Sequence, residues 1–118
     1  VQNIKPLGFL DYVKLQANAL LVVSDSGTLT EESAILGFPG VLIRTSTERP
    51  EGLDAGTIVV GGIKSRDVLA ASELSIKISS ERPITILPVD YLSTDVSTKV
   101  VKVIQSYVHI VNKTTWHK

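Results

Sequence analysis

Short apolar runs alternate along this chain with longer segments whose apolar residues recur at helical spacing. Three runs have the length of β-strands, and they lie at residues 19–23, 41–43 and 57–60. Helical patterns lie between and around them, at residues 9–19, 28–36 and 65–78. Apolar strands separated by helices are typical of a parallel sheet that is covered on both faces. The pattern therefore predicts an α/β fold whose ligands bind beyond the carboxyl ends of the strands.

Glycine and proline mark where several of these elements end. Gly37, followed closely by Pro39, is expected to stop the second helix. Pro50 excludes a central strand over residues 44–52, which we interpret as a loop at the carboxyl end of the second strand. Residues 79–93 contain two prolines and predict a loop or linker.

The last segment predicts an amphipathic helix that begins at Thr94 or Asp95. Its apolar residues form one stripe, made of Val96, Val100, Val103, Ile104, Tyr107 and Val111. Because the chain offers only three strands for its helices to cover, we expect this stripe to pack on a missing N-terminal domain. The predicted organisation is a ligand-binding domain over residues 1–93 and a C-terminal helix over residues 94–118. An uncovered apolar stripe also predicts self-association, so we expect a homo-oligomer.

Composition narrows the functional classes. The 118 residues suit one small domain, with 43% hydrophobic and 20% charged residues. Lys and Arg total 12 and balance 12 Asp and Glu, whereas a nucleic-acid binder usually carries a basic surplus. No apolar run approaches a membrane span, and cysteine is absent, which excludes disulfides and thiolate metal sites. We therefore expect a cytoplasmic protein without nucleic-acid or membrane partners, and, since it starts on valine without any methionine, a segment of a longer one.

The turn after the first strand is the first candidate site. Ser26, Gly27 and Thr28 lead from the strand into a helix, whose unpaired N–H groups and dipole favour an anion such as a diphosphate. The alternative is plain helix capping by Ser26 or Thr28, with a capping box between Thr28 and Glu31, and the local pattern alone favours it. Glu31 and Glu32 are about 100° apart around the helix, so only one can face the ligand at the turn.

The loop after the second strand is the second candidate site. Arg44 follows that strand directly, and Glu48 and Arg49 come shortly after it. Arginine suits phosphate recognition because its planar guanidinium donates two parallel hydrogen bonds. The alternative is a solvated loop held by Arg–Glu pairs, which is the commoner case in isolation. Because the carboxyl ends of parallel strands meet at one edge, we expect this loop and the first turn to open on the same side of the sheet.

Other motifs point to no catalytic residue, metal or cofactor. The chain lacks the spacing of a phosphate loop, a dinucleotide-binding glycine motif, a nucleophile elbow and a zinc-binding helix. We interpret His109 and His117 as surface or packing residues and Asp25 as a turn former. Trp116 is either a docking aromatic or part of a frayed terminus.

Several short motifs occur in order between residues 9 and 62. They are Ser24-Asp25-Ser26-Gly27, Glu31-Glu32, Leu36-Gly37-Phe38-Pro39, Arg44, Thr47-Glu48-Arg49-Pro50-Glu51 and Ala55-Gly56-Thr57. In this order they resemble the C-terminal half of non-hydrolysing UDP-N-acetylglucosamine 2-epimerases. The resemblance implies a partial Rossmann-like parallel sheet, the C-terminal half-domain of a glycosyltransferase-B-type fold. It also implies an isomerase that inverts C2 of a UDP-N-acetylhexosamine by eliminating and re-adding UDP.

The resemblance implies roles for individual residues. Ser26 and Gly27 would hold the diphosphate, Glu32 would accept hydrogen bonds from the ribose hydroxyls, Arg49 would line the nucleotide site, and Tyr12 would lie near the uracil.

Further positions support or modify this assignment. Thr28 belongs to the UDP-binding turn but stands where the family commonly has a second glycine, and Leu7 replaces a polar residue near the uracil. Arg44 and Glu48 are expected to support the site. The Ser-Gly-Thr turn and the tail around Tyr107 look more like the branch that makes UDP-N-acetyl-L-fucosamine for capsule or O-antigen.

The proton-transfer residues of the family belong to regions upstream of this chain, so we expect the chain alone to lack turnover. Two alternatives remain open. The first is the nucleotide-sugar-binding domain of a glycosyltransferase, which uses the same architecture. The second is a binding or interaction module without catalysis.

Overall fold

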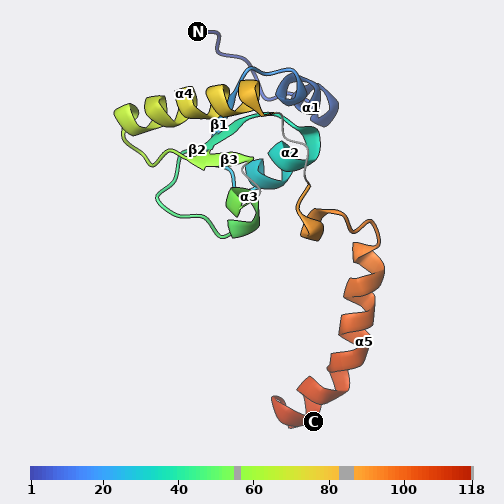
Figure 1. Ribbon diagram of the computed structural model, residues 1–118. Coiled ribbons are helices and arrows are strands. Elements are labelled where there is room, and N and C mark those ends of the chain that lie inside the picture. The colour runs from blue at the N-terminus through green and yellow to red at the C-terminus, as the bar shows by residue number, and fades with distance from the viewer. Residues whose placement is uncertain (55–56, 83–86, 118) are drawn as a thin grey trace.

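The computed structural model describes residues 1–54, 57–82 and 87–117 and contains a three-stranded parallel sheet (Figure 1). The strands are β1 (Val22–Ser24), β2 (Gly40–Leu42) and β3 (Ile58–Val60), in the order β1-β2-β3. In the register, Gly40 of β2 lies between Val22 and Ile58. The predicted α/β class with a parallel sheet is confirmed.

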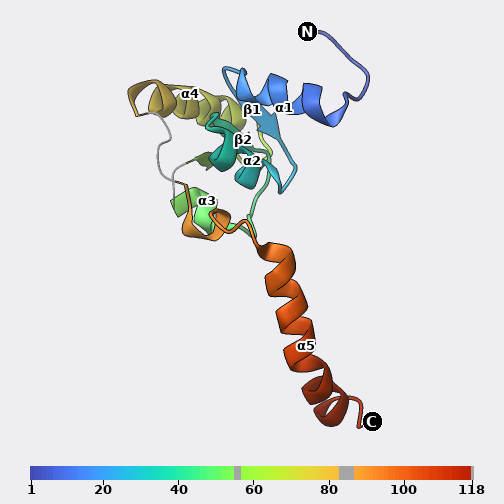
Figure 2. The ribbon, with the colours of Figure 1, turned by 90° about the vertical axis from the view of Figure 1, so that its right-hand side faces the viewer.

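Helices surround this sheet and extend beyond it. They are α1 (Phe9–Ala17), α2 (Leu29–Leu36), α3 (Pro50–Asp54), α4 (Ser65–Glu81), the 3-10 helix η1 (Val89–Tyr91) and α5 (Val96–Thr114). Figures 1 and 2 show α2 and α4 on opposite faces of the sheet. None of the helices within the described residues combines the length and the hydropathy that crossing a lipid bilayer requires.

The core lies between the sheet and α2. Its buried side chains are Leu29, Phe38, Leu42 and Ile58. Side chains of successive strand residues point to opposite faces, so Val41 turns away from this core, toward Gly61 and Ala71 on the α4 side. The two faces of the sheet are thus covered by different helices, as the continuous apolar strands predict.

The end of α2 has the expected glycine stop. Gly37 adopts the left-handed conformation, with φ of 74°, and its N–H donates to the carbonyl of Ser33 at 2.9 Å. The fully buried hydroxyl of Ser33 contacts the carbonyl oxygens of Phe38 and Thr57, at 2.6 and 3.0 Å. The chain therefore leaves α2 along a fixed path that places β2 beside β1.

Several boundaries differ from the sequence prediction. The first strand begins at Val22 rather than at residue 19, and α3 begins at Pro50 inside the predicted loop. Proline is favoured at the first position of a helix because its missing N–H has no intrahelical acceptor there. Helix α4 runs to Glu81, so the predicted linker is shorter and contains η1. The parts of these predictions that fall on residues 55–56 and 83–86 lie outside the described residues.

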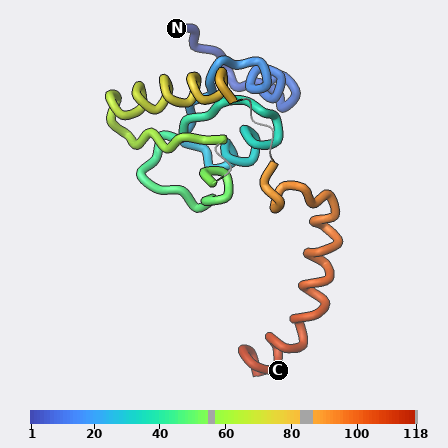
Figure 3. The backbone as a smooth tube through the Cα atoms, in the orientation of Figure 1, coloured from blue at the N-terminus to red at the C-terminus, as the bar shows by residue number. Residues whose placement is uncertain are grey.

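Helix α5 extends away from the sheet, as the tube in Figure 3 shows. It begins at Val96 with Asp95 in the N-cap position, in agreement with the predicted start, and Lys99 pairs with Asp95 at 3.1 Å. No residue of α5 is buried, and its apolar stripe is exposed along its length. Packing of this stripe on another part of a longer protein, and self-association through it, stay predictions.

Candidate functional site

The two loops that follow β1 and β2 lie together at one edge of the sheet. The N–H of Ile43 donates to the carbonyl of Ser24 at 2.9 Å, which carries the strand pairing to the ends of both strands. The Arg44 side chain then donates through Nε to the carbonyl of Asp25 at 2.6 Å. This confirms that the turn after β1 and the loop after β2 open on the same side, and it gives Arg44 the role of joining them.

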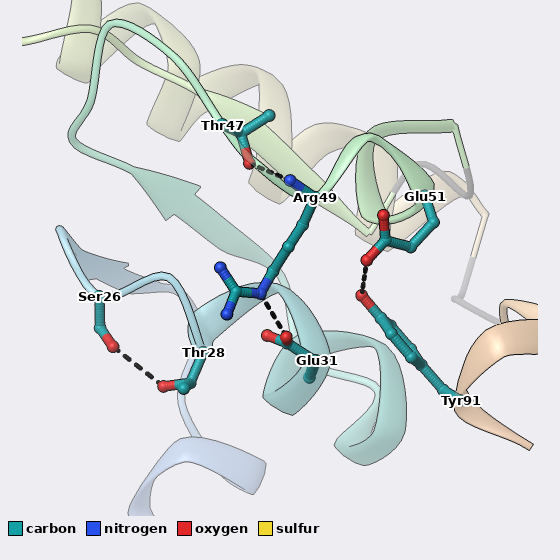
Figure 4. Close-up of polar contacts among 7 residues, drawn as sticks. All are labelled: Ser26, Thr28, Glu31, Thr47, Arg49, Glu51 and Tyr91. Carbon is teal, nitrogen blue, oxygen red and sulfur yellow. Dashed lines mark hydrogen bonds and ion pairs between the residues drawn. The ribbon is translucent and has the colours of Figure 1, made fainter. Parts of the chain in front are cut away.

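The turn at Ser26 is closed by hydroxyl groups. The Ser24 hydroxyl accepts the N–H of Ser26 at 3.0 Å, and within the described residues the Asp25 carboxylate accepts no backbone N–H, so the observed side-chain turn is made by Ser24 rather than by Asp25. The hydroxyls of Ser26 and Thr28 lie 2.9 Å apart (Figure 4). Thr28 is the N-cap of α2 but makes no side-chain capping bond, so the capping alternative is wrong. The hydroxyls of the turn bond to each other instead of to the helix.

The backbone of the same turn presents hydrogen-bond donors. The carbonyls of Ser26 and Gly27 accept from the first residues of α2. Among the residues that the structure describes, no acceptor contacts the N–H of Gly27 or of Thr28. These two donors stand at the N-terminus of α2, where the helix dipole also favours a negative charge.

Arg49 lies directly over this turn. Its Nε donates to the carboxylate of Glu31, and its own N–H is held by the Thr47 hydroxyl at 3.2 Å (Figure 4). A Cβ atom at position 27 would lie only 2.7 Å from Nη1 of Arg49. Glycine at position 27 therefore lets the guanidinium lie against the backbone of the turn. The hydrogen bond to Glu31 raises the pKa of Arg49 above its ordinary value, and the charges of Glu31 and of the exposed Glu48 add to this effect.

The two adjacent glutamates of α2 point to different partners. Glu31 binds Arg49 at the turn, whereas Glu32 accepts a hydrogen bond from Nε2 of Gln16 in α1 at 2.6 Å. Tyr12 lies on the same side as Glu32: its pKa is raised first by burial and then by the charge of Glu32. The expectation that only one glutamate faces the turn is met, and that residue is Glu31. Glu32 faces α1 instead, where Tyr12 lies, so these two residues form a second group apart from the turn.

An open pocket of about 440 Å³ between α1 and α2 is lined by Thr28 and both glutamates, whereas Tyr12 lines a separate hollow together with Gln16. Its wall is mostly apolar, with Thr28 at one end and the two glutamates along α2. The lining residues are Phe9, Val13, Thr28, Glu31, Glu32, Ile35 and Leu36. Donors for an anion at the turn and carboxylate acceptors along α2 thus belong to one continuous surface.

Sequence reasoning missed Tyr91, which belongs to the loop side of the site. Its hydroxyl donates to the carboxylate of Glu51 at 2.8 Å and ties η1 to the first turn of α3, one residue after the start of that helix (Figure 4). The pKa of Tyr91 is raised, first because the phenol is partly buried and then because Glu51 accepts its hydrogen bond and repels the phenolate. The two residues are 40 positions apart, so no local pattern in the sequence connects them.

Known proteins resemble this chain in sequence. The sequence profile of the family described as UDP-N-acetylglucosamine 2-epimerase matches residues 1–105. The UDP-N-acetylglucosamine 2-epimerase of Methanococcus maripaludis is 39% identical over 77 residues, which cover 65% of this chain and 21% of the relative. The enzyme of the same name from Salmonella typhimurium is 42% identical over 67 residues, which cover 57% of this chain and 18% of the relative.

A solved structure resembles almost the whole chain. The structure of UDP-N-acetylglucosamine 2-epimerase from Rickettsia bellii superposes with a TM-score of 0.81 at 41% identity. The match covers 98% of this chain and 32% of the Rickettsia chain. This chain therefore spans about a third of that structure and about a fifth of the curated relatives.

The Tyr91–Glu51 contact predicts an unusual titration. An unperturbed tyrosine ionises at about pH 10, and Tyr91 should ionise above it. The ultraviolet absorbance of the tyrosinates is measured against pH for the unmodified chain and for Tyr91→Phe, and the difference between the two curves reports the ionisation of Tyr91. In a Glu51→Gln background an acceptor remains but its negative charge is gone, so the pH at which Tyr91 ionises should move back toward about 10. A Tyr91 phenolate that forms at or below about pH 10 in the unmodified chain would contradict the contact.

Proposed function

Because this chain belongs to the UDP-N-acetylglucosamine 2-epimerase family, we propose that it binds the UDP part of a UDP-N-acetylhexosamine within a longer enzyme that inverts C2. The observation that carries the proposal is the Arg49 guanidinium lying over the Gly27 turn. That arrangement gathers in one place a permanent positive charge, a helix N-terminus and backbone donors that have no acceptor among the described residues.

The diphosphate binds at the turn in this proposal. Glu31 holds Nε of Arg49, so the two terminal nitrogens of the guanidinium stay available on the side of Gly27. With the N–H groups of Gly27 and Thr28, they offer donors of the kind that phosphate oxygens accept. The hydroxyls of Ser26 and Thr28 lie at the same turn and can donate once they exchange their mutual bond for the ligand. Glu31 thus acts through Arg49 rather than on the anion.

The nucleoside binds further along α2. Glu32 lines the pocket that begins at Thr28, and a carboxylate is a suitable acceptor for the hydroxyl groups of a ribose. Tyr12, which feels the charge of Glu32, lies near enough to offer an aromatic surface for the uracil. The order from turn to α1 is then diphosphate, ribose and base.

The chemistry of C2 inversion is assigned to other segments of the enzyme. In the proposed reaction UDP leaves C1 and a proton leaves C2, which gives a glycal-type intermediate with a C1–C2 double bond. UDP then adds back to C1 as a proton adds to the opposite face of C2, which requires groups that remove and return the C2 proton. We place those groups, and the opposite wall of the substrate cleft, outside this chain, and we propose that the α5 stripe packs against that part. The isolated chain then binds UDP weakly and does not turn over, because half a cleft neither positions the reacting groups nor excludes water.

The Ser26-Gly27-Thr28 sequence of the turn supports a narrower proposal about the branch of the family. We propose that the enzyme acts in the branch that makes UDP-N-acetyl-L-fucosamine for capsule or O-antigen, in the cytoplasm.

UDP binding by the chain should depend on Arg49 and Glu32. Arg49→Ala removes the charge at the turn and Glu32→Ala removes the ribose acceptor, and each should weaken UDP binding by about tenfold or more, the effect of losing a charged hydrogen bond. Arg66→Ala, at a side chain that is 96% exposed on α4, is the matched control and should leave binding unchanged. Calorimetry with UDP measures all three. Unchanged affinity in both site variants would reject these assignments.

The reaction itself is tested in the complete enzyme. With a UDP-N-acetylhexosamine in deuterium oxide, proton NMR should show loss of the C2 proton signal as the two epimers interconvert. Arg49→Ala should slow this exchange, and Arg66→Ala should not. Retention of the C2 proton, or turnover that requires a sugar acceptor, would count against an epimerase and for sugar transfer.

A further inference from the structure

Gln16 is the buried residue of α1, although its neighbours in that helix are apolar and largely exposed. Only 3% of Gln16 is accessible, whereas Leu10 is 79% and Leu15 is 55% exposed. Glutamine is rarely buried to this extent, because its amide must then find partners inside the protein. The inversion of burial between Gln16 and the leucines indicates a specific requirement at this position.

The Gln16 amide has one strong partner. Its Nε2 donates to Oε2 of Glu32 at 2.6 Å, from α1 to α2. An ionised carboxylate only accepts hydrogen bonds, so the nitrogen of the amide must face Glu32 and the oxygen must face away. That oxygen, Oε1, is buried and has no partner among the residues that the structure describes. The packing therefore leaves a buried acceptor unsatisfied and keeps the bond to Glu32.

This bond fixes how Glu32 presents itself. Gln16 engages one carboxylate oxygen, and no hydrogen bond within the described residues engages the other, Oε1. Glu32 also lines the pocket between α1 and α2 that starts at the turn. A carboxylate held by one oxygen offers the second in a defined direction, without the rotational freedom of an exposed glutamate.

We infer that Gln16 is a positioning residue that holds Oε2 of Glu32 so that Oε1 meets the ribose hydroxyls of the nucleotide. The inference rests on the proposed function, in which Glu32 is the ribose acceptor. It assigns the discrimination between a ribose and a sugar without its two hydroxyls to the pair Gln16–Glu32. Gln16 touches neither the diphosphate nor the turn, so affinity for the diphosphate part is independent of it.

The test compares UDP with 2′,3′-dideoxy-UDP, which keeps the base and the diphosphate but lacks both hydroxyls. Binding of each to the isotope-labelled chain is measured by NMR titration. In the unmodified chain UDP should bind more tightly. Gln16→Met keeps the length of the side chain but cannot donate, so it should reduce this preference about tenfold while the affinity for the dideoxy ligand stays the same. Gln105→Met, at an exposed glutamine of α5, is the matched control.

A second variant tests whether the preference for UDP depends on pH, which a purely structural role of Gln16 would not predict. Gln16→Glu places two carboxyl groups at hydrogen-bond distance, and such a pair holds a shared proton at low pH. The preference for UDP should then be present near pH 5 and lost near pH 8. The charged and titratable groups beside Glu32 and Gln16 include Tyr12 of α1, whose pKa responds to the charge of Glu32 and to a hydrogen bond with Gln16, and the Arg49-bound Glu31. Titration of the ligand phosphates cancels, because it is the same for both ligands.

The outcomes separate the inference from the proposed function. Loss of the preference in Gln16→Met with unchanged dideoxy-UDP binding, together with its pH-dependent return in Gln16→Glu, supports the positioning role. A preference that survives both substitutions overturns it and leaves the nucleotide site standing. An equal loss of affinity for both ligands in Gln16→Met assigns Gln16 to packing alone and also overturns it. An unmodified chain that binds neither ligand overturns the proposed function, and the inference with it.

Discussion

The site depends on the ion pair between Arg49 and Glu31, which connects the loop after β2 to the first turn of α2. Both side chains keep about 30% of their surface exposed, at 30% and 31%, so the pair contributes little to stability by itself. Its effect is geometric. It holds the guanidinium over Gly27, where a side chain at position 27 would collide with it, beside two backbone N–H groups that no acceptor contacts in the part of the chain that the structure describes. The loop, the turn and the helix meet at this edge of the sheet, so these contacts lie side by side.

Because of that pair, the two adjacent glutamates of α2 have different roles. Glu31 is committed to Arg49, so the neighbouring Glu32 is free to face α1, where Gln16 holds it. The same short helix therefore carries an anion-binding end and an acceptor along its side. This arrangement suits a ligand that has a negatively charged group and a hydroxyl-bearing ring a few ångströms apart.

Local patterns in the sequence were sufficient for the parallel strands and the main helices, but not for the short helices α3 and η1. The apolar runs and the Gly37 stop predicted the strands and the end of α2, because burial of a strand and left-handed backbone each require particular residue types. That the loop with Arg49 opens on the same side as the turn also followed, from strand order and loop position, whereas the role of Arg49 itself was implied by the family resemblance. The choice between Glu31 and Glu32 did not follow, since it depends on how α1 and the loop pack around α2. Gln16 and Tyr91 were missed because their partners are 16 and 40 residues away.

In the proposed complex, the N–H groups of Gly27 and Thr28, under Arg49, receive the diphosphate of a nucleotide. The most direct measurement is a proton–nitrogen NMR titration of the chain with UDP and, separately, with uridine. UDP is expected to shift the amide signals of both residues and the Arg49 Nε–H signal along one binding curve, and uridine is expected to leave them in place. Signals that ignore UDP, or that respond equally to uridine, would contradict it.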